Sequence, residues 1–434
     1  MKVVIFGSSG DLAKRKLFPA LSRIDLEGVG VVGYARTKYN IEFSEVLQEV
    51  GNYSPEFLSK VTYIPGPYDD LSKLKEVSDS ETVLYFSVPS SVYTCLFREI
   101  SKLDYKVIGV EKPYGDSIES FMEIKGFDLG KTRFIDHYLL KPLVVAMPGI
   151  IRETGAIREV MSNRYVKSVE IVSKEVLGGE GRHYFDKNGI IRDMVLSHMG
   201  ELLGVVASDV TKPSRIMEAL ARMEVFKACT VDTERCIYGQ YDDYIKEIHK
   251  DSSTETFCMV PISIGTPRWS KVPFIIVAGK GMNEKRTEII LEFRRDVFAK
   301  CIELFSMPRQ SSCRIVHTNE IETVRLVFNI YPECEVFLEV LVGGEPVRYV
   351  LHDKKEIDGL MHDSYGGYHD YEIIFDSLVR GKDFSSVSSQ EAELLWKVFN
   401  PILSISKEDM LFYYSKGIDM PKEAEEMIRE IKDH

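Results

Sequence analysis

The sequence lacks the features of a secreted or membrane-bound chain. No apolar run is long enough to span a bilayer, and the first residues run directly into an apolar segment rather than a charged leader with a cleavage site. The seven cysteines are odd in number, scattered and without a C-x-x-C pair. This spacing argues against a disulfide framework and a zinc ribbon. We therefore expect a cytoplasmic protein without a bound metal.

A surplus of positive charge is also missing. Lys and Arg total 55 whereas Asp and Glu total 67, which gives a formal net charge of −12. Nucleic acid and acidic membranes are poor partners for such a chain. An anionic ligand would require lysines and arginines gathered at its site. The length of 434 residues, with 44% hydrophobic and 28% charged residues, is typical of a globular protein of two or three domains.

The first 140 residues alternate short apolar runs with longer amphipathic stretches. The runs rich in β-branched and aromatic residues are Val3–Phe6, Val29–Tyr34, Val61–Ile64, Val83–Val88, Val107–Val110 and Phe134–Ile135. Between them, Ser44–Val50 and Ser91–Ile100 are typical of helices. Strands and helices in this order predict right-handed crossovers and a parallel sheet, an α/β domain of the Rossmann type over residues 1–140.

The pattern changes after about residue 150, where apolar and polar residues alternate with a period of two. These runs are Lys167–Ser173, Phe274–Ala278, Thr287–Phe293, Thr323–Ile330 and Glu335–Leu341. The alternation predicts a mostly antiparallel sheet with one solvated face. Two apolar helical stretches, Ile190–Val206 and Gln390–Leu403, are expected to pack against it. Residues 141–434 are thus predicted to form a larger α+β domain.

A glycine-containing loop follows the first predicted strand. Its sequence is Gly7-Ser8-Ser9-Gly10-Asp11-Leu12-Ala13, a G-x-x-G-x-x-A pattern at a strand-to-helix turn. Glycines there let backbone amides approach a pyrophosphate at the positive end of a helix. A tight turn that merely contains glycine is the alternative. The position of the loop at the first strand of an alternating α/β segment favours dinucleotide binding.

The end of the second strand indicates which dinucleotide. A site for NAD usually places Asp or Glu there, to bind the ribose 2′-hydroxyl. This chain has Arg36 instead, followed by Thr37 and Lys38. A guanidinium is suited to a 2′-phosphate. Although a strand-end arginine can simply be solvated, the glycine loop favours the reading that the cofactor is NADP.

Polar and aromatic residues follow three further strands of the predicted sheet. Tyr93 comes after the fourth strand, Lys112 after the fifth, and Asp136 and His137 after the sixth. Ligands of open parallel sheets bind at the carboxyl ends of the strands. Each residue has an ordinary explanation alone, such as a surface lysine or a helix cap. Their convergence on one edge predicts a site.

The sequence resembles the glucose-6-phosphate 1-dehydrogenase family over essentially its whole length. The segments that carry the resemblance are Gly7–Lys14, Glu111–Gly115, Ile135–Leu139, Lys174–Gly178, Glu180–Arg182, Gly189–Met194, Val272–Phe274, Gly279–Lys280, Asn283–Lys285 and Asp370–Glu372. The resemblance implies an oxidoreductase that oxidises glucose 6-phosphate at C1 to 6-phosphoglucono-1,5-lactone and transfers the hydride to NADP. It also implies entry to the pentose phosphate pathway and a homodimer formed through the second domain.

The resemblance further implies roles for individual residues. His198 would be the general base and Asp136 its carboxylate partner, as in other carboxylate–histidine pairs. The implied substrate-binding residues are Lys112, His137, Tyr138, Lys141, Glu175, Asp193, Lys280 and Lys285. The implied cofactor-binding residues are Gly7, Ser8, Ser9, Gly10, Asp11, Leu12, Arg36, Tyr93 and Lys112. The spacing of His137 and Lys141 would place both on one face of a helix.

The sequence departs from the family pattern beside the expected phosphate site. Pro142 follows Lys141 and disfavours helical angles there, and Tyr331 stands where the family often has glutamine. Two other functions stay open. One is an oxidoreductase of the broader Glu-Lys-Pro class that acts on a neutral sugar or cyclitol, for which Asp136-His137-Tyr138 and Lys141 would be unnecessary. The other is a non-catalytic NADP-binding sensor, which would not need His198 and Asp136.

Overall fold

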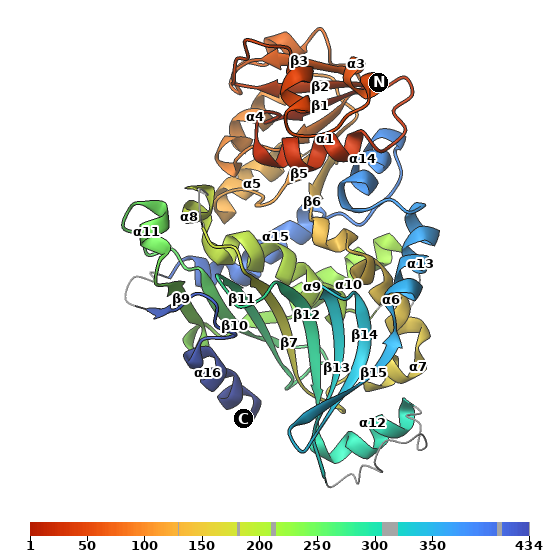
Figure 1. Cartoon of the computed structure of the whole chain (residues 1–434), viewed down its shortest axis with the longest axis vertical. Coiled ribbons are helices and arrows are strands. Elements are labelled where there is room, and N and C mark those ends of the chain that lie inside the picture. The colour runs from red at the N-terminus through yellow and green to blue at the C-terminus, as the bar shows by residue number, and fades with distance from the viewer. Residues whose placement is uncertain (129, 180–182, 210–213, 306–319, 406–409, 434) are drawn as a thin grey trace. The chain divides into compact units, whose positions relative to one another are not determined.

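The computed structural model describes residues 1–128, 130–179, 183–209, 214–305, 320–405 and 410–433. The chain divides into two units (Figure 1), the first made of Met1–Leu140 and Tyr368–Trp396, the second of Lys141–Gly367 and Lys397–His434. In the described part of the chain, no helix has the length and apolar character needed to cross a membrane. Cys313, one of the seven cysteines, and Glu180–Arg182, one of the segments that resemble the family, lie outside the described residues.

The first unit is built on a six-stranded, wholly parallel sheet. Its strands are β1 (Lys2–Phe6), β2 (Gly30–Ala35), β3 (Val61–Pro65), β4 (Val83–Phe86), β5 (Val107–Glu111) and β6 (Thr132–Ile135). Their order is β3-β2-β1-β4-β5-β6, so the direction of winding reverses between β1 and β4. All six strands fall on the predicted apolar runs, which confirms the α/β Rossmann-type fold.

Helices and short turns connect these strands. They are η1 (Ala13–Leu17), α1 (Phe18–Leu21), α2 (Phe43–Gln48), α3 (Pro55–Ser59), η2 (Ser72–Leu74), η3 (Ser90–Val92), α4 (Tyr93–Ile100), α5 (Ile118–Gly126) and η4 (His137–Leu140). The helix after β1 contains the π-helical turn η1, a feature often found at functional sites.

A late segment of the chain returns to this first unit, although the sequence prediction assigned it to the second domain. Helix α14 (Asp370–Arg380) has eight buried residues among the nine from Tyr371 to Val379, and none of the nine is exposed. Its Phe375 ring lies 4.9 Å from the ring of Tyr85 in β4. Burial of each large apolar side chain contributes about 1.5–3 kcal/mol, which explains why the helix covers this sheet. The prediction that residues 141–434 form one continuous domain is wrong in this segment.

The second unit is built on a ten-stranded sheet. Its strands are β7 (Val166–Glu175), β8 (Cys229–Val231), β9 (Ile237–Tyr241), β10 (Phe257–Ile264), β11 (Pro273–Lys280), β12 (Arg286–Phe293), β13 (Ile321–Tyr331), β14 (Glu335–Val342), β15 (Glu345–His352) and β16 (Leu411–Tyr414). The order is β15-β14-β13-β12-β7-β11-β10-β9-β16, with β8 paired to β10. Only the β7–β11 and β16–β9 pairs of this described sheet are parallel, which confirms the mostly antiparallel prediction.

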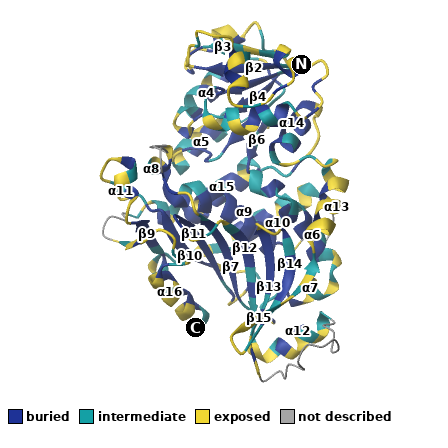
Figure 2. Cartoon of the chain, viewed as in Figure 1, coloured by how far each residue is buried: buried dark blue, intermediate teal, exposed yellow. Residues whose placement is uncertain are grey.

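The helices of this unit are α6 (Pro142–Glu153), α7 (Gly155–Val160), α8 (His183–Ile190), η5 (Ile191–Met199), α9 (Gly200–Ala207), α10 (Arg215–Lys227), η6 (Thr233–Arg235), α11 (Tyr244–Ile248), η7 (Arg295–Val297), α12 (Phe298–Leu304), α13 (Lys354–Tyr365) and α16 (Lys422–Asp433). Helix η5 contacts β7 and β11, as predicted for the 190–206 stretch. Helix α15 (Ser389–Leu403) belongs to the first unit as far as Trp396, whose indole donates to the carbonyl of Tyr114. Figure 2 shows the central strands of both sheets as buried.

Candidate active site

The glycine loop after β1 is a tight turn that only glycine fits. Gly7 has φ +79°, and its amide donates to the carbonyl of Tyr34 at 2.8 Å. A Cβ atom at Gly7 would lie 2.0 Å from the carbonyl oxygen of Ser87 in the backbone after β4. The amide of Gly10 donates to the Gly7 carbonyl at 2.8 Å. The chain thus passes directly from the strand into the helix with glycine at both bends, the arrangement that a pyrophosphate site requires.

The end of β2 lies beside this loop. The hydroxyl of Thr37 donates to that of Ser9 at 3.0 Å, which ties the two segments together. Arg36 is exposed, and its guanidinium carbon lies 5.5 Å from the ring centre of Tyr68. A guanidinium stacked on an aromatic ring is held in place while its donors stay available to a ligand.

Two other residues of the expected cofactor set have evident local partners. Asp11 is exposed at the start of the helix and pairs with Arg15 at 2.7 Å. Tyr93 is fully buried, and its hydroxyl donates to the carbonyl oxygen of Glu111 at 2.7 Å. Tyr93 therefore braces the end of β5, and its contact with a cofactor stays a prediction.

The ends of β5 and β6 are adjacent, as the sequence predicted. Glu111 pairs with Ile135 in the parallel register, so Lys112 and Asp136 follow from neighbouring strands. Asp136 is buried, and its Oδ1 accepts a hydrogen bond from the amide of Tyr138 at 2.9 Å. This bond caps the 3₁₀ turn η4. Asp136 therefore has a structural role as a cap, whether or not it also takes part in the reaction.

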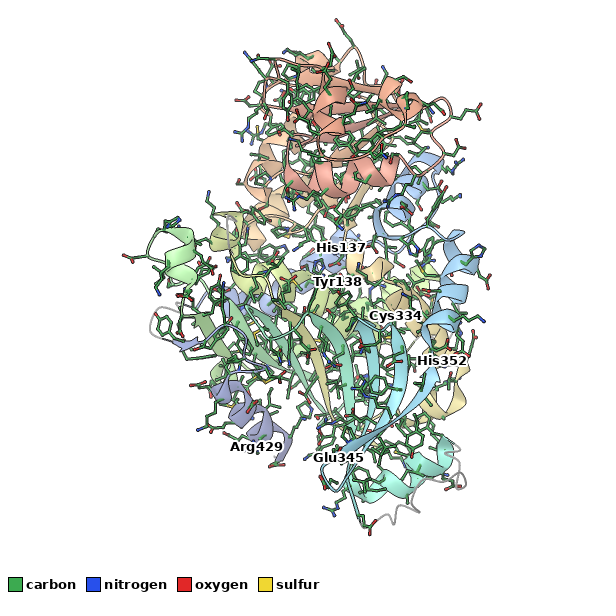
Figure 3. The ribbon with its side chains drawn as sticks, in the orientation of Figure 1. His137, Tyr138, Cys334, Glu345, His352 and Arg429 are labelled. Carbon is green, nitrogen blue, oxygen red and sulfur yellow. The ribbon has the colours of Figure 1, made fainter. Side chains whose placement is uncertain are left out.

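His137 and Tyr138 extend from η4 (Figure 3), and their ring centres are 5.2 Å apart. The prediction that a helix places His137 and Lys141 on one face is wrong. The 3₁₀ turn ends at Leu140, and Lys141 is extended, with φ −65° and ψ 138°. Pro142 explains the difference, because its ring disfavours helical angles at the preceding residue and begins the new helix α6.

In the second unit, three of the expected substrate-binding residues meet at one edge of the sheet. Lys280 ends β11 and pairs in register with Glu175, which ends β7. The Lys280 ammonium forms ion pairs with Glu175 and, at 3.2 Å, with Asp193 of η5. Burial opposes the charge of Lys280, but the two carboxylates outweigh it and raise its pKa. Lys280 is therefore a cation, and its partly exposed carboxylates remain able to accept hydrogen bonds from hydroxyl groups.

Lys285 lies at the same edge, just before β12. Its ammonium is 4.7 Å from the ring centre of Tyr331, which ends β13 and pairs in register with Thr287. Tyr331 is 44% exposed, so its ring offers apolar surface where the family often has glutamine. This edge therefore combines two cations, two carboxylates and an aromatic ring.

His198 lies in η5, a π-helical segment whose residues are mostly buried. The side chain of His198 is only 2% exposed. The hydroxyl of Ser197, the residue directly before it, donates to the carbonyl of Asp193 in the preceding turn at 3.2 Å. Because wide helical turns of this kind often occur at functional sites, the local structure agrees with the predicted importance of the segment.

Sequence reasoning missed a buried cluster in the first unit. Tyr85 of β4 donates to a carboxyl oxygen of Glu111 at 2.5 Å, and the Tyr371 hydroxyl also bonds to Glu111. Burial raises the pKa of Glu111 to about 7, against the lowering effect of these hydrogen bonds. Two features of the sequence could have indicated this cluster. Glu111 directly precedes Lys112, and Asp370-Tyr371-Glu372 matches the family.

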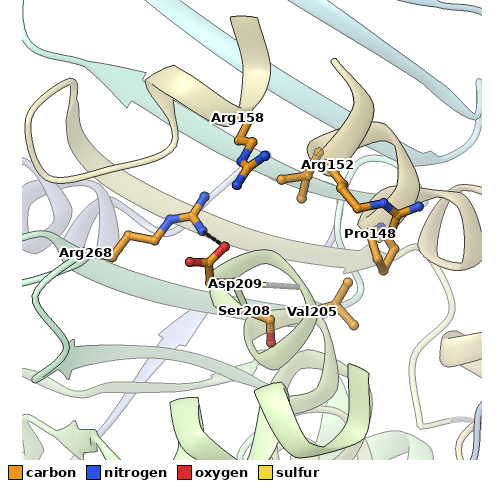
Figure 4. Close-up of a pocket in the computed structure, with 8 residues that line it drawn as sticks. Pro148, Arg152, Arg158, Val205, Ser208, Asp209 and Arg268 are labelled. Atoms are coloured by element: carbon orange, nitrogen blue, oxygen red, sulfur yellow. Dashed lines mark ion pairs between the residues drawn. The ribbon is translucent and has the colours of Figure 1, made fainter. Parts of the chain in front are cut away.

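A separate cavity in the second unit is too small to be the site. It is lined by Pro148, Ile151, Arg152, Arg158, Val205, Ser208, Asp209 and Arg268 (Figure 4). Its interior space is about 10 Å³, and Arg268 pairs with Asp209 across it at 3.1 Å. Such a volume holds about one water molecule, so these arginines are better explained as structural.

Comparison with known proteins agrees with this geometry. Residues 4–145 match the family model described as "Glucose-6-phosphate dehydrogenase, NAD binding domain", and residues 153–434 match "Glucose-6-phosphate dehydrogenase, C-terminal domain". The chain belongs to the glucose-6-phosphate dehydrogenase family. Its relatives include the protein named glucose-6-phosphate 1-dehydrogenase 6, cytoplasmic, of Arabidopsis thaliana, which is 29% identical over 99% of this chain and 90% of that protein. A probable glucose-6-phosphate 1-dehydrogenase of Schizosaccharomyces pombe is 27% identical over 99% of both chains.

Solved structures show the same relationship. A glucose-6-phosphate dehydrogenase in complex with its substrate glucose 6-phosphate has a TM-score of 0.79 and 25% identity, and the match covers 99% of this chain and 97% of that chain. A 3-ketoreductase from Actinomadura kijaniata, with a TM-score of 0.53 and 11% identity, shares the fold alone. Family membership confirms the expected fold class and the expected oxidoreductase family, with NADP as the cofactor that the family implies. The roles of individual residues stay predictions.

Proposed function

We propose that the protein oxidises glucose 6-phosphate at C1 to 6-phosphoglucono-1,5-lactone, with transfer of the hydride to NADP. The observation that carries the proposal is the match to both family domains along nearly the whole chain, by sequence and by fold. The residues at the strand ends of each unit support the proposal. The first unit offers a glycine loop with Arg36 for a dinucleotide, and the second offers groups that bind hydroxyls.

The first unit has the residues that NADP requires. The backbone amides after Gly7 and Gly10 would bind the pyrophosphate, because their loop leads from β1 directly into the start of the following helix. Arg36 would bind the 2′-phosphate through its exposed guanidinium. Bound NADP would supply the hydride acceptor.

We assign the proton transfer to His198, by the family resemblance. Its imidazole would take the proton of the C1 hydroxyl while the C1 hydride leaves, so that the hemiacetal carbon becomes the lactone carbonyl. Asp136 would orient the ring and stabilise the imidazolium that forms.

The remaining residues divide into groups for the phosphate and for the sugar hydroxyls. His137, Tyr138 and Lys141 would bind the phosphate, and Lys112 would lie between sugar and nicotinamide. Glu175 and Asp193 would accept hydrogen bonds from the hydroxyls. Their common partner Lys280 fixes their positions through ion pairs. Lys285 would contribute a further cation.

A substrate panel tests this function. The purified protein is supplied with NADP and, in turn, glucose 6-phosphate, other sugar phosphates, glucose and a cyclitol, while the absorbance of reduced nicotinamide is followed. Glucose 6-phosphate should give the highest kcat/KM. A neutral sugar or cyclitol as the better substrate would support the broader Glu-Lys-Pro class, and NADP binding without turnover of any compound would support a sensor.

We also infer that the protein is a cytoplasmic homodimer with no nucleic-acid or membrane partner. Several relatives carry "cytoplasmic" in their names, and the net charge of −12 disfavours polyanions. Light scattering at micromolar concentration should give twice the 49.5 kDa mass of one chain. A monomer mass would reject the dimer without affecting the catalytic proposal.

A further inference from the structure

The buried carboxyl of Glu111 has no role in the function proposed above, although it directly precedes Lys112. It ends β5 and is 6% exposed. The hydroxyl of Tyr85 reaches it from β4, past Gly109, where a Cβ atom would lie 2.7 Å from the tyrosine ring. The glycine on β5 therefore makes room for the hydrogen bond between Tyr85 and Glu111.

The second tyrosine at this carboxyl links it to His137. Tyr371 lies in the first turn of α14, is 7% exposed, and bonds to Glu111 through its hydroxyl. The face of its ring stacks on the imidazole of His137, with ring centres 6.0 Å apart and planes inclined by 23°. The ring is thus anchored at its hydroxyl by a buried carboxyl while its face supports a residue of the expected phosphate site.

Burial and the charges around Glu111 keep the hydroxyls of both tyrosines protonated, so that they can donate hydrogen bonds. Burial and the charge of Glu111 hold the pKa of Tyr85 and of Tyr371 well above the usual value. Lys112, the residue directly after β5, lowers the pKa of Glu111, whereas Asp136 after β6 raises it. Around neutral pH the hydroxyls therefore stay protonated and continue to donate to the carboxyl.

We propose that Glu111 and Tyr371 are positioning residues for His137, in which the buried carboxyl holds the tyrosine and the tyrosine ring holds the imidazole. The inference rests on the proposed function, which assigns His137 to the phosphate of the sugar. Tyr85 offers a matched control, because its hydroxyl bonds to the same carboxyl while its ring packs against Phe375, at 4.9 Å, rather than against His137.

Steady-state kinetics of the full chain test the proposal. Glu111→Gln and Tyr371→Phe should raise KM for glucose 6-phosphate about five- to tenfold, as expected for the loss of one charge-assisted hydrogen bond. The kcat should stay within about threefold and KM for NADP within about twofold. Tyr85→Phe should leave KM for the sugar phosphate within about twofold. An unchanged KM in Glu111→Gln and Tyr371→Phe, or an equal rise in Tyr85→Phe, would overturn the proposal.

A spectroscopic measurement keeps the test independent of turnover. In protein labelled with ¹³C at histidine, His137→Asn identifies the His137 ring signal by its disappearance. Glu111→Gln and Tyr371→Phe should shift this signal, and Tyr85→Phe should shift it less. A signal unmoved by the first two variants would overturn the positioning role. Failure of the wild type to oxidise glucose 6-phosphate would instead reject the proposed function.

Discussion

We propose that Arg36 selects NADP over NAD. Its exposed guanidinium is stacked on Tyr68 at the end of β2, beside the glycine loop. Arg36→Ala should weaken NADP binding about 10- to 100-fold, because charge-assisted hydrogen bonds to the 2′-phosphate are lost, while NAD binding changes less than about threefold. Calorimetric titration with both dinucleotides measures these two affinities.

Arg15→Ala is the control. It removes a nearby cation paired with Asp11 and should leave both affinities nearly unchanged. Equal losses for NADP and NAD in Arg36→Ala would remove Arg36 from cofactor selection.

Glu111 should make folding stability depend on pH. Burial raises its pKa from the ordinary 4.5 to about 7, so the folded state binds more protons than the unfolded state between these values. Stability contributed by the protonated form is therefore lost as the pH rises through this window, by at most about 3 kcal/mol.

Glu111→Gln carries no charge and removes this dependence. The free energy of unfolding of the wild type, minus that of Glu111→Gln, should fall between pH 5 and pH 8 in urea titrations. The amide adds a mismatched donor toward the tyrosines, but that cost is independent of pH. Parallel curves for the two proteins would show that Glu111 is already ionised at pH 5.

At the scale of elements, the turn between β1 and its helix should tolerate no side chain. Gly7 combines φ +79° with a Cβ position 2.0 Å from the Ser87 carbonyl oxygen. Gly7→Ala should abolish NADP binding or folding. Gly28 has φ +67° but open space around its Cβ position, so Gly28→Ala should cost only about 1 kcal/mol and leave binding intact. Comparable effects of the two substitutions in denaturation and NADP titration would contradict the steric explanation.

All six strands of the first sheet and five of the second were predicted from sequence, because their burial follows directly from local pattern, whereas β8, β9, β10, β15 and β16 were missed. Runs such as Val3–Phe6 are buried on both faces of a parallel sheet, and alternating runs such as Thr287–Phe293 belong to the antiparallel sheet. The destination of α14 was not predictable. Its apolar residues show that it is buried, but the spacing does not say which sheet it covers.

The candidate site was likewise only partly predictable, because local spacing does not reveal contacts between distant segments. The glycine turn after β1 could be predicted because glycine requirements are local. The cluster of Glu111, Tyr85 and Tyr371 could not, because it joins three distant segments through hydroxyls that no spacing reveals. The ion pairs of Lys280 with Glu175 and Asp193 join residues that the family resemblance named. The pair with Glu175 follows from the parallel register of β7 and β11, and the pair with Asp193 from the contact of η5 with these strands.

At the scale of the whole molecule, the proposed reaction uses residues of both units. We propose that the glycine loop and Arg36 of the first unit hold the cofactor and that His198 of the second unit accepts the proton. If this division is right, removing the base should leave cofactor binding unaffected. A substitution at His198 separates the two tasks, since it lies on η5 and not on the dinucleotide fold.

The most direct test is the turnover of His198→Asn with glucose 6-phosphate, measured together with its affinity for NADP. The kcat should fall about 100-fold or more, as for other losses of a general base, while the Kd for NADP stays within about twofold. His249→Asn is the matched control, because His249 is exposed and has φ +56°, a conformation that asparagine tolerates. The control should keep full activity. A folded His198→Asn protein with nearly wild-type kcat would contradict the account.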